Sequence, residues 1–135
     1  MTNERALPYP TGWDTMKAIF VETTGFSEVR EDFLPDPAYS RLQKELMADP
    51  EAGDVMPGCG SLRKLRISDD KRGKGKRGGA RVIYLYVPQV SRFYMIDIYG
   101  KDEQDDLSQA DRKAFRELAE AIKAAAVAKN EEHKP

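Results

Sequence analysis

The alternation of apolar and polar residues along the chain predicts four strands. Residues 16–22 alternate weakly and residues 62–68 alternate with period two, whereas residues 80–87 and 93–99 are rich in β-branched and aromatic side chains. Because short connections join the last three strands, we expect them to form an antiparallel meander. The first strand would join the same sheet through a longer connection.

Apolar residues at helical spacing predict three helices, over residues 26–34, 36–48 and 108–129. Ser108 precedes Asp111 by three residues, a near capping box that would begin the third helix. The resulting order β-α-α-β-β-β-α indicates an α+β fold. We expect a small antiparallel sheet with the helices packed on one face.

The chain of 135 residues has the length of a single domain. Residues 1–15 form a predicted N-terminal extension, loosely ordered and containing two prolines; residues 16–129 form the domain, and residues 130–135 a frayed tail. No apolar run is long enough for a membrane helix, and the first residues lack the apolar region of a signal peptide. The single cysteine, Cys59, is consistent with a reduced, cytoplasmic setting.

The formal net charge of −1 seems to argue against a nucleic-acid partner, but the charge is unevenly distributed. Residues 62–81 contain nine basic and two acidic residues, a local charge of +7, and the remainder of the chain therefore carries −8. This separation indicates a basic patch within an otherwise acidic protein, and makes the patch the first place to look for function.

Several cations of this patch are expected to share one face of the sheet. Period two in the strand over 62–68 puts Lys64 and Arg66 on the face opposite its core residues. Arg81 opens the next strand and would join them if the strands pair in a suitable register, and Lys101 follows the last strand. Phosphates suit such a cluster, because guanidinium binds two oxygens at once and lysine supplies a compact charge. A solvated polar sheet face is the alternative.

The loop over residues 69–79 is rich in lysine, arginine and glycine. Its glycines permit close approach of the backbone, and its cations would attract a polyanion. Lys74, Lys76 and Arg77 of this loop, together with Arg63 on the preceding strand, are the candidate RNA-binding residues. The alternative is a flexible hairpin loop whose charge only aids solubility.

Other candidate chemistry is sparse. The single histidine, His133, lies near the C-terminus, which nearly excludes a histidine acid/base pair, and no metal or other cofactor is expected. One of the four tyrosines of the last two strands, which include Tyr99, could stack on a base or move a proton, although most are expected in the core. Asp97 could orient a cation or be an ordinary carboxylate on the sheet face.

In combination, these segments resemble the RelE/ParE superfamily of toxins, and in particular the HigB-type branch of type II toxin–antitoxin modules. The resemblance runs from Ile19 to Leu118. It is carried by FVETTGF, DPAYSRLQKEL, PEAGDVMPGCGSLRKLRI, GKGKRGGARVIYLYV and YGKDEQDDLS. It implies a RelE-like fold, in agreement with the order of elements predicted above.

The resemblance also implies an activity, that of a ribosome-dependent, metal-free mRNA endonuclease that inhibits translation and arrests growth. In such toxins the 2′-hydroxyl attacks the scissile phosphate of the mRNA in the ribosomal A site, close to 16S rRNA. The implied partner is a HigA-like antitoxin with a helix-turn-helix domain. A ParE-like gyrase inhibitor and a non-catalytic ribosome or RNA binder remain alternatives.

The family's catalytic residues correspond by position to Lys64 and Arg66 on the second strand, Arg81 on the third and Lys101 after the last. The resemblance implies that Lys64 is the base or proton shuttle, that Arg66 and Arg81 hold the phosphate, and that Lys101 assists the leaving oxygen or holds RNA. RelE-like members have an arginine and a tyrosine near the C-terminal end, whereas the matching stretch here begins with Lys101 and contains no tyrosine. Either Tyr99 substitutes for that tyrosine or the acid/base scheme differs.

Overall fold

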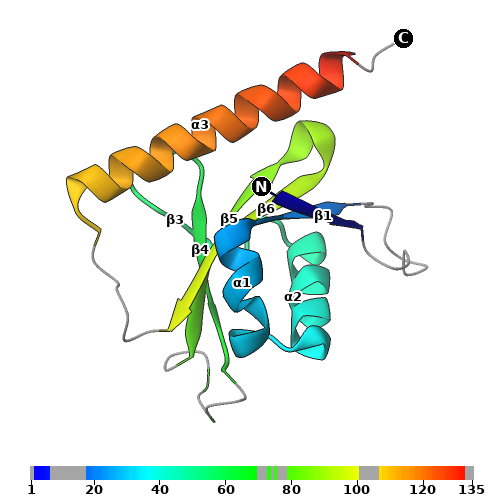
Figure 1. The fold of residues 1–135 in the computed structure, drawn as a ribbon, viewed down its shortest axis with the longest axis vertical. Coiled ribbons are helices and arrows are strands. Elements are labelled where there is room, and N and C mark those ends of the chain that lie inside the picture. Colours follow the sequence, from blue (N-terminus) through cyan, green and yellow to red (C-terminus); the bar gives the residue numbers. More distant parts are fainter. Residues whose placement is uncertain are drawn as a thin grey trace.

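The computed structural model describes residues 2–6, 18–69, 73, 75, 79–100 and 107–132, of which residues 2–6 and 129–132 are described by their backbone alone. Its elements follow in chain order (Figure 1). They are β1 (Thr2–Ala6), β2 (Ile19–Thr23), α1 (Thr24–Phe33), α2 (Asp36–Ala48), β3 (Asp54–Val55), β4 (Arg63–Ile67), β5 (Ala80–Val87), the short 3-10 helix η2 (Pro88–Val90), β6 (Arg92–Gly100) and α3 (Gln109–Glu132).

The described strands form one sheet in the order β1-β2-β6-β5-β4-β3. The antiparallel meander β4-β5-β6 confirms the prediction for the last three strands. The expectation of a wholly antiparallel sheet is wrong, because β2 pairs with β6 in parallel. Two helices separate β2 from the meander. A connection of this length allows two strands to pair in parallel, whereas a short hairpin can join only antiparallel strands.

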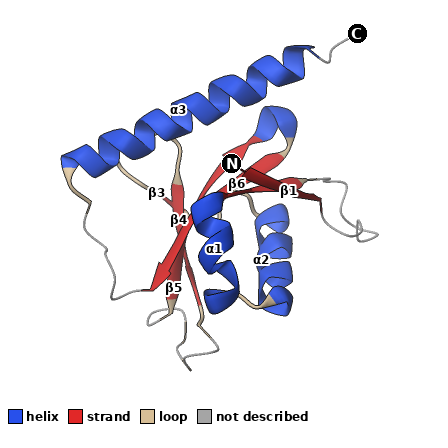
Figure 2. Cartoon of the chain, viewed as in Figure 1, coloured by secondary structure: helices blue, strands red, loops and turns tan. Residues whose placement is uncertain are grey.

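The helices cover both faces of the sheet, so the α+β class is confirmed but the expected packing on one face is wrong. Val82 and Tyr84 of β5 share a core with α1 and α2, whereas Ile83 and Leu85 share a second core with α3. Figure 2 shows α3 on one side of the strands and the two shorter helices on the other. The near-continuous apolar run of β5 reflects this burial on both faces.

Two strands lie where the sequence predicted none. β1 falls within the predicted extension and pairs antiparallel with β2, and β3 pairs with β4 over two residues. Both lie at the edges of the sheet, where a strand has one neighbour and needs no strong apolar alternation. Residues 130–132, expected in the tail, continue α3.

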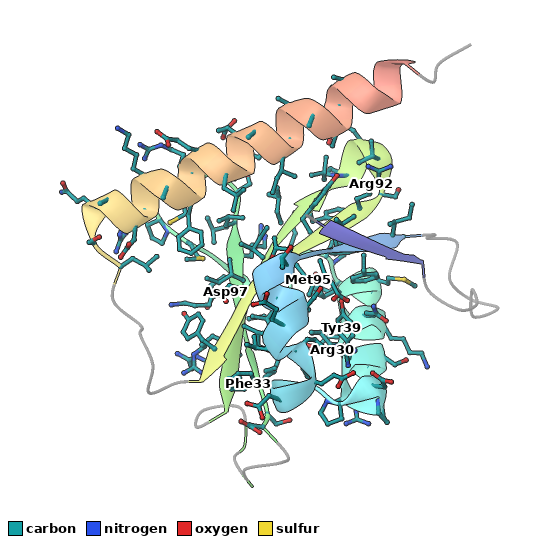
Figure 3. All side chains as sticks on the ribbon, viewed as in Figure 1. Arg30, Phe33, Tyr39, Arg92, Met95 and Asp97 are labelled. Atoms are coloured by element: carbon teal, nitrogen blue, oxygen red, sulfur yellow. The ribbon has the colours of Figure 1, made fainter. Side chains whose placement is uncertain are left out.

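A polar cluster joins β2 to α1 and α2. The buried carboxylate of Glu22 accepts hydrogen bonds from Ser27 Oγ at 2.7 Å and from Tyr39 Oη at 2.9 Å. The guanidinium of Arg30 lies 4.9 Å from the centre of the Tyr39 ring and donates to Asp36 at 2.7 Å. Figure 3 labels Arg30 on α1 and Tyr39 on α2 at this contact. The cluster sets the position of both helices on this face.

The long helix α3 is fixed at its start and along its length. The predicted capping box is confirmed, since Asp111 N donates to Ser108 Oγ at 3.0 Å and Ser108 N donates to Asp111 Oδ2 at 3.2 Å. Gly60 has φ +72°, and a Cβ there would lie 3.0 Å from Ala119 Cβ. The loop before β4 therefore approaches α3 closely only because residue 60 is glycine.

Candidate nucleic-acid interface

The register of the meander brings three of the candidate side chains into one row across the sheet. Arg66 on β4 pairs with Arg81 on β5, and Arg81 in turn pairs with Tyr99 on β6. Directly paired residues point to the same face, with Cβ atoms about 4.5–5.5 Å apart. Arg66, Arg81 and Tyr99 are therefore neighbours, although 33 positions separate the first from the last.

A second row lies two residues further along the strands. Lys64 pairs with Ile83, and Ile83 pairs with Asp97 of β6. Since Ile83 belongs to the core beneath α3, both rows lie on the α3 face of the sheet. The rise of a strand puts the rows about 7 Å apart. Sequence periodicity therefore predicted correctly that Lys64 and Arg66 share a face.

Lys64, Arg66 and Arg81 line a single hollow of about 420 Å³, which we call the basic hollow. The carboxylates of Glu45 and Asp54 also line it, so three cations face two anions. Two guanidinium groups and one ammonium group provide enough donors to bind the oxygens of a phosphate.

The three cations differ in how firmly the protein holds them. Arg81 is only 4% exposed and donates to the carbonyl oxygen of Ala80 at 3.3 Å. Lys64 is half-buried and Arg66 is exposed. Burial restricts the rotamers of Arg81, so that its guanidinium is held in position before a ligand arrives, whereas Arg66 can move to meet the ligand.

Arg63 lies on the other face of β4 and does not join the basic hollow. Its Nη1 donates to the carbonyl oxygen of Gly53 at 2.7 Å, and its Nη2 lies 3.8 Å from Glu51 Oε2. The neighbouring Tyr84 donates to the carbonyl oxygen of Pro50 at 2.9 Å and accepts from Gly53 N at 3.0 Å. These contacts fix the segment after α2 against β4. The assignment of Arg63 to RNA binding stays a prediction.

The Tyr84 hydroxyl is the titratable group whose pKa departs most clearly from its ordinary value in the described structure. Burial raises the pKa of Tyr84, and the hydrogen bond from the Gly53 backbone opposes that effect in part. The residue therefore remains neutral to a higher pH than an exposed tyrosine. Tyr84 lies on β5 in the core shared with α1 and α2 and does not line the basic hollow, which indicates a structural role.

Four candidates, namely Lys74, Lys76, Arg77 and Lys101, lie outside the described residues. The strands next to them are described. Ile67 pairs with Ala80, and Ala80 pairs with Gly100. These three residues form the row next to Arg66, Arg81 and Tyr99. Strands β4 and β6 therefore end, and β5 begins, at the end of the sheet that carries the cations.

A β-bulge positions two residues whose place the sequence did not reveal. The pairing of β5 with β6 shifts between Ile83 and Tyr84, so that Ile96 is an extra residue on β6. Strict alternation would put Asp97 and Tyr99 on the face of Met95, in the core beneath α1 and α2. The bulge instead turns both toward the face of Arg81. No residue type marks this bulge in the sequence.

Two general properties of the described residues complete the picture. No three histidine, cysteine, aspartate or glutamate side chains among them are grouped so as to hold a metal ion. No helix in the described part of the chain combines the length and the apolar character needed to cross a membrane.

The fold and the site define a small α+β protein whose mixed sheet carries a cluster of cations beside a hollow. A sequence model described as the RelE toxin of the RelE/RelB toxin–antitoxin system matches residues 41–133. This range covers more than half of the chain and includes the whole meander and α3. The chain therefore belongs to the RelE toxin family, the toxins of a toxin–antitoxin system. Its assignment to the HigB branch stays a prediction.

Proposed function

We propose that this RelE-family toxin is a HigB-type, ribosome-dependent mRNA endonuclease that needs no metal, inhibits translation and arrests growth. The observation that most supports the proposal is the basic hollow, where Lys64, Arg66 and Arg81 converge from two strands. Its volume of about 420 Å³ is in the range of small-ligand sites and suits a phosphate with its ribose.

The proposed reaction is attack of a ribose 2′-hydroxyl on the adjacent phosphorus. The O2′–P bond forms and the P–O5′ bond breaks, which leaves a 2′,3′-cyclic phosphate and a 5′-hydroxyl. The attacking oxygen must lose a proton and the leaving oxygen must gain one. Negative charge grows on the non-bridging oxygens in the phosphorane-like state, so fixed cations beside them lower the barrier.

The described geometry suggests how the roles are divided. Arg81, held by burial, would bind a non-bridging oxygen in a fixed position, and the exposed Arg66 would close on the phosphate from β4. Lys64 would act as the base or proton shuttle. Tyr99 pairs with Arg81 and would provide a second hydroxyl for proton transfer. Lys101 would assist the leaving oxygen.

The uneven charge of the chain supports a substrate presented by the ribosome. The segment over 62–81 carries +7 and the remainder −8. The acidic remainder would repel free RNA, so the mRNA is expected to arrive in the A site beside 16S rRNA, guided by Arg63, Lys74, Lys76 and Arg77. A HigA-like antitoxin with a helix-turn-helix domain would cover or distort the basic hollow in the cytoplasm.

The test is cleavage of a defined mRNA on translating ribosomes, mapped by primer extension. Cleavage at codon boundaries is expected, with little cutting of the same mRNA without ribosomes. The double variant Lys64→Ala/Arg81→Ala should lower the cleavage rate by about 100-fold or more. Lys44→Ala, which removes a charge from the exposed surface of α2, is the matched control.

Three outcomes would contradict the proposal. Uncut mRNA on arrested ribosomes would indicate a non-catalytic ribosome binder. Trapped gyrase–DNA complexes with intact mRNA would indicate a ParE-like inhibitor. Full cleavage by a folded Lys64→Ala/Arg81→Ala variant would move the active site away from the basic hollow.

A further inference from the structure

A second cluster of cations lies on α3, outside the basic hollow. Arg112, Lys113 and Arg116 line a hollow of about 400 Å³, which we call the α3 hollow. It is formed by the beginning of α3 and the loop between β3 and β4, and its other described lining residues are Gly58, Gln109 and Ala110. The three cations belong to the part of the chain that carries −8 overall, so the distribution of charge along the sequence did not reveal them.

The loop between β3 and β4 holds both arginines of this cluster. Arg112 Nη1 donates to the carbonyl oxygen of Pro57 at 3.0 Å, and Arg116 Nη1 donates to that of Gly58 at 3.2 Å. Arg112 Nε also donates to the carbonyl oxygen of Leu107 at 3.5 Å. These partners are neutral, so they orient the two guanidinium groups without cancelling their charge. A guanidinium has five N–H donors, and these bonds leave several of them for a ligand.

The stability of α3 does not explain why the three cations lie together. Arg112 and Arg116 are four residues apart, so their like charges lie on one face of the helix and destabilise it slightly. Lys113 is exposed and adds a third positive charge to the same hollow. The hydrogen bonds to the loop account for the two arginines but not for the lysine beside them. An anion in the α3 hollow would offset the repulsion among all three.

The lining of the α3 hollow indicates the kind of anion. None of its described lining residues has an aromatic ring, on which single-stranded RNA stacks its bases, or a carboxylate. Ala110 is its only apolar side chain among those residues, whereas a protein partner is held mainly by large apolar anchors. Cations among small residues suit phosphate oxygens, which arginine binds with two N–H groups at once. Structured RNA presents its phosphates outward while its bases are paired, and it therefore fits this lining best.

The α3 hollow lies close to the basic hollow. Asp54 of β3 lines the basic hollow, and Gly58, four residues further along the chain, lines the α3 hollow. Four residues span at most about 14 Å, so one large particle can contact both hollows at once. Figure 1 shows the segment between β3 and β4 running to the beginning of α3.

We infer that the α3 hollow binds phosphates of ribosomal RNA and anchors the toxin on the ribosome while the mRNA occupies the basic hollow. The inference rests on the proposed function, because that function brings the chain to the ribosome. It assigns different tasks to the two clusters: the α3 hollow contributes to binding of the ribosome, and the basic hollow to the chemical step. Substitutions in the two hollows should therefore change different kinetic constants.

The test is binding of the whole chain to vacant ribosomes, which carry no mRNA, measured by co-sedimentation over a range of salt concentrations. Arg112→Gln/Lys113→Gln/Arg116→Gln should weaken binding at least about tenfold. The slope of log affinity against log salt should become shallower by about two to three, because each lost phosphate contact removes just under one. On translating ribosomes this variant should raise KM and leave kcat nearly unchanged, whereas Lys64→Ala/Arg81→Ala should lower kcat.

A single substitution keeps the test valid if loss of the two arginines loosens the loop. Lys113 is exposed, and the hydrogen bonds between α3 and Pro57 and Gly58 do not involve it. Lys113→Gln should weaken binding of vacant ribosomes about threefold or more and reduce the salt slope by about one. Lys44→Gln on the exposed surface of α2 makes the same change of charge and should alter neither quantity.

The inference is overturned if the chain does not bind vacant ribosomes, or if Lys113→Gln and Lys44→Gln weaken binding equally. Weaker binding only to ribosomes that carry mRNA would also overturn it, since the α3 hollow would then hold mRNA. A further probe is the amide NMR signals of Gly58 and Ala110. If poly-glutamate shifts them and a short RNA duplex does not, the hollow receives an acidic protein instead.

Failure of the inference can be distinguished from failure of the proposed function. A chain that binds vacant ribosomes through the α3 hollow but cuts no mRNA would overturn the proposed function alone. A folded triple variant that cleaves mRNA on ribosomes with unchanged KM would overturn the inference alone.

Discussion

The two faces of the sheet use their arginines differently. On the side of α1 and α2, Arg30 of α1 donates to the carbonyl oxygen of Leu34 at 2.9 Å and to Asp36 at 2.7 Å, and Arg63 of β4 donates to the carbonyl oxygen of Gly53. On β4 and β5, Arg66 and Arg81 line the basic hollow, to which α2 contributes Glu45. The comparison indicates that Arg30 and Arg63 stabilise the fold through carbonyl and carboxylate oxygens. Arg66 and Arg81 instead border a hollow large enough for an anion, although Arg81 also donates to a backbone carbonyl.

The difference arises from how far the helices extend over each face. The core beneath α1 and α2 continues along β5 as far as Val82 and Ala80. The core beneath α3 includes Ile83 and Leu85 of β5 but does not reach Arg81. Since α3 crosses only part of its face (Figure 1), the end of the sheet that carries the two rows is left for polar side chains.

The largest effect is expected from a substitution in the core that the sheet shares with α1 and α2. Phe93 is fully buried and stacks on Phe20, with ring centres 4.8 Å apart, and on Tyr86 at 4.6 Å. Phe93→Ala should lower the free energy of unfolding by about 3–5 kcal/mol, because it leaves a cavity among these rings. Urea unfolding followed by circular dichroism measures the change, and a loss below about 1 kcal/mol would contradict this account of the core.

The comparison between the faces is sharpened by two arginines of the same strand. Arg66→Ala should lower ribosomal cleavage about 100-fold and leave stability nearly unchanged. Arg63→Ala should lower the free energy of unfolding by about 1–2 kcal/mol, because Gly53 loses a charged donor, and reduce cleavage much less. Cleavage and urea unfolding would be measured on both variants. If Arg63→Ala abolished cleavage and Arg66→Ala lowered stability instead, Arg63 would be the functional residue and Arg66 the structural one.

Tyr84 makes the stability of the core beneath α1 and α2 testable through its pH dependence. Its pKa in the folded chain is raised by burial above the ordinary value near 10, so folding favours the neutral hydroxyl. The free energy of unfolding should therefore be constant below pH ~10 with respect to this group and fall as pH rises further. Tyr84→Phe should cost about 1–2 kcal/mol at pH 7 and flatten this alkaline decline, and an unchanged decline would assign it to other groups.

The smallest effect is expected at the start of α3. Ser108→Ala removes the acceptor of Asp111 N and should lower the free energy of unfolding by about 1 kcal/mol. Gln109→Ala, one residue further on, is the control and should change it by less than about 0.5 kcal/mol. Equal effects of the two substitutions would show that the capping box does not stabilise the helix.

Much of the fold could be predicted from local pattern. The meander, the three helices and the capping box at Ser108 follow from periodicity and end signals, and the structure has them close to the predicted positions. The parallel pairing of β2 with β6 and the place of α3 on the opposite face could not be predicted in this way. A long connection and an apolar run buried on both faces are compatible with more than one arrangement.

The sequence by itself determined that Lys64 and Arg66 share a face and that positive charge is concentrated over residues 62–81, because periodicity and composition are properties of neighbouring residues. Only the tertiary structure decided that Arg66 pairs with Arg81, that Arg81 is buried and that Arg63 donates to the carbonyl oxygen of Gly53. It also decided that a bulge turns Asp97 and Tyr99 toward the cations. Strand register and a bulge depend on how separate strands pair, and a shift of one residue moves every side chain to the opposite face.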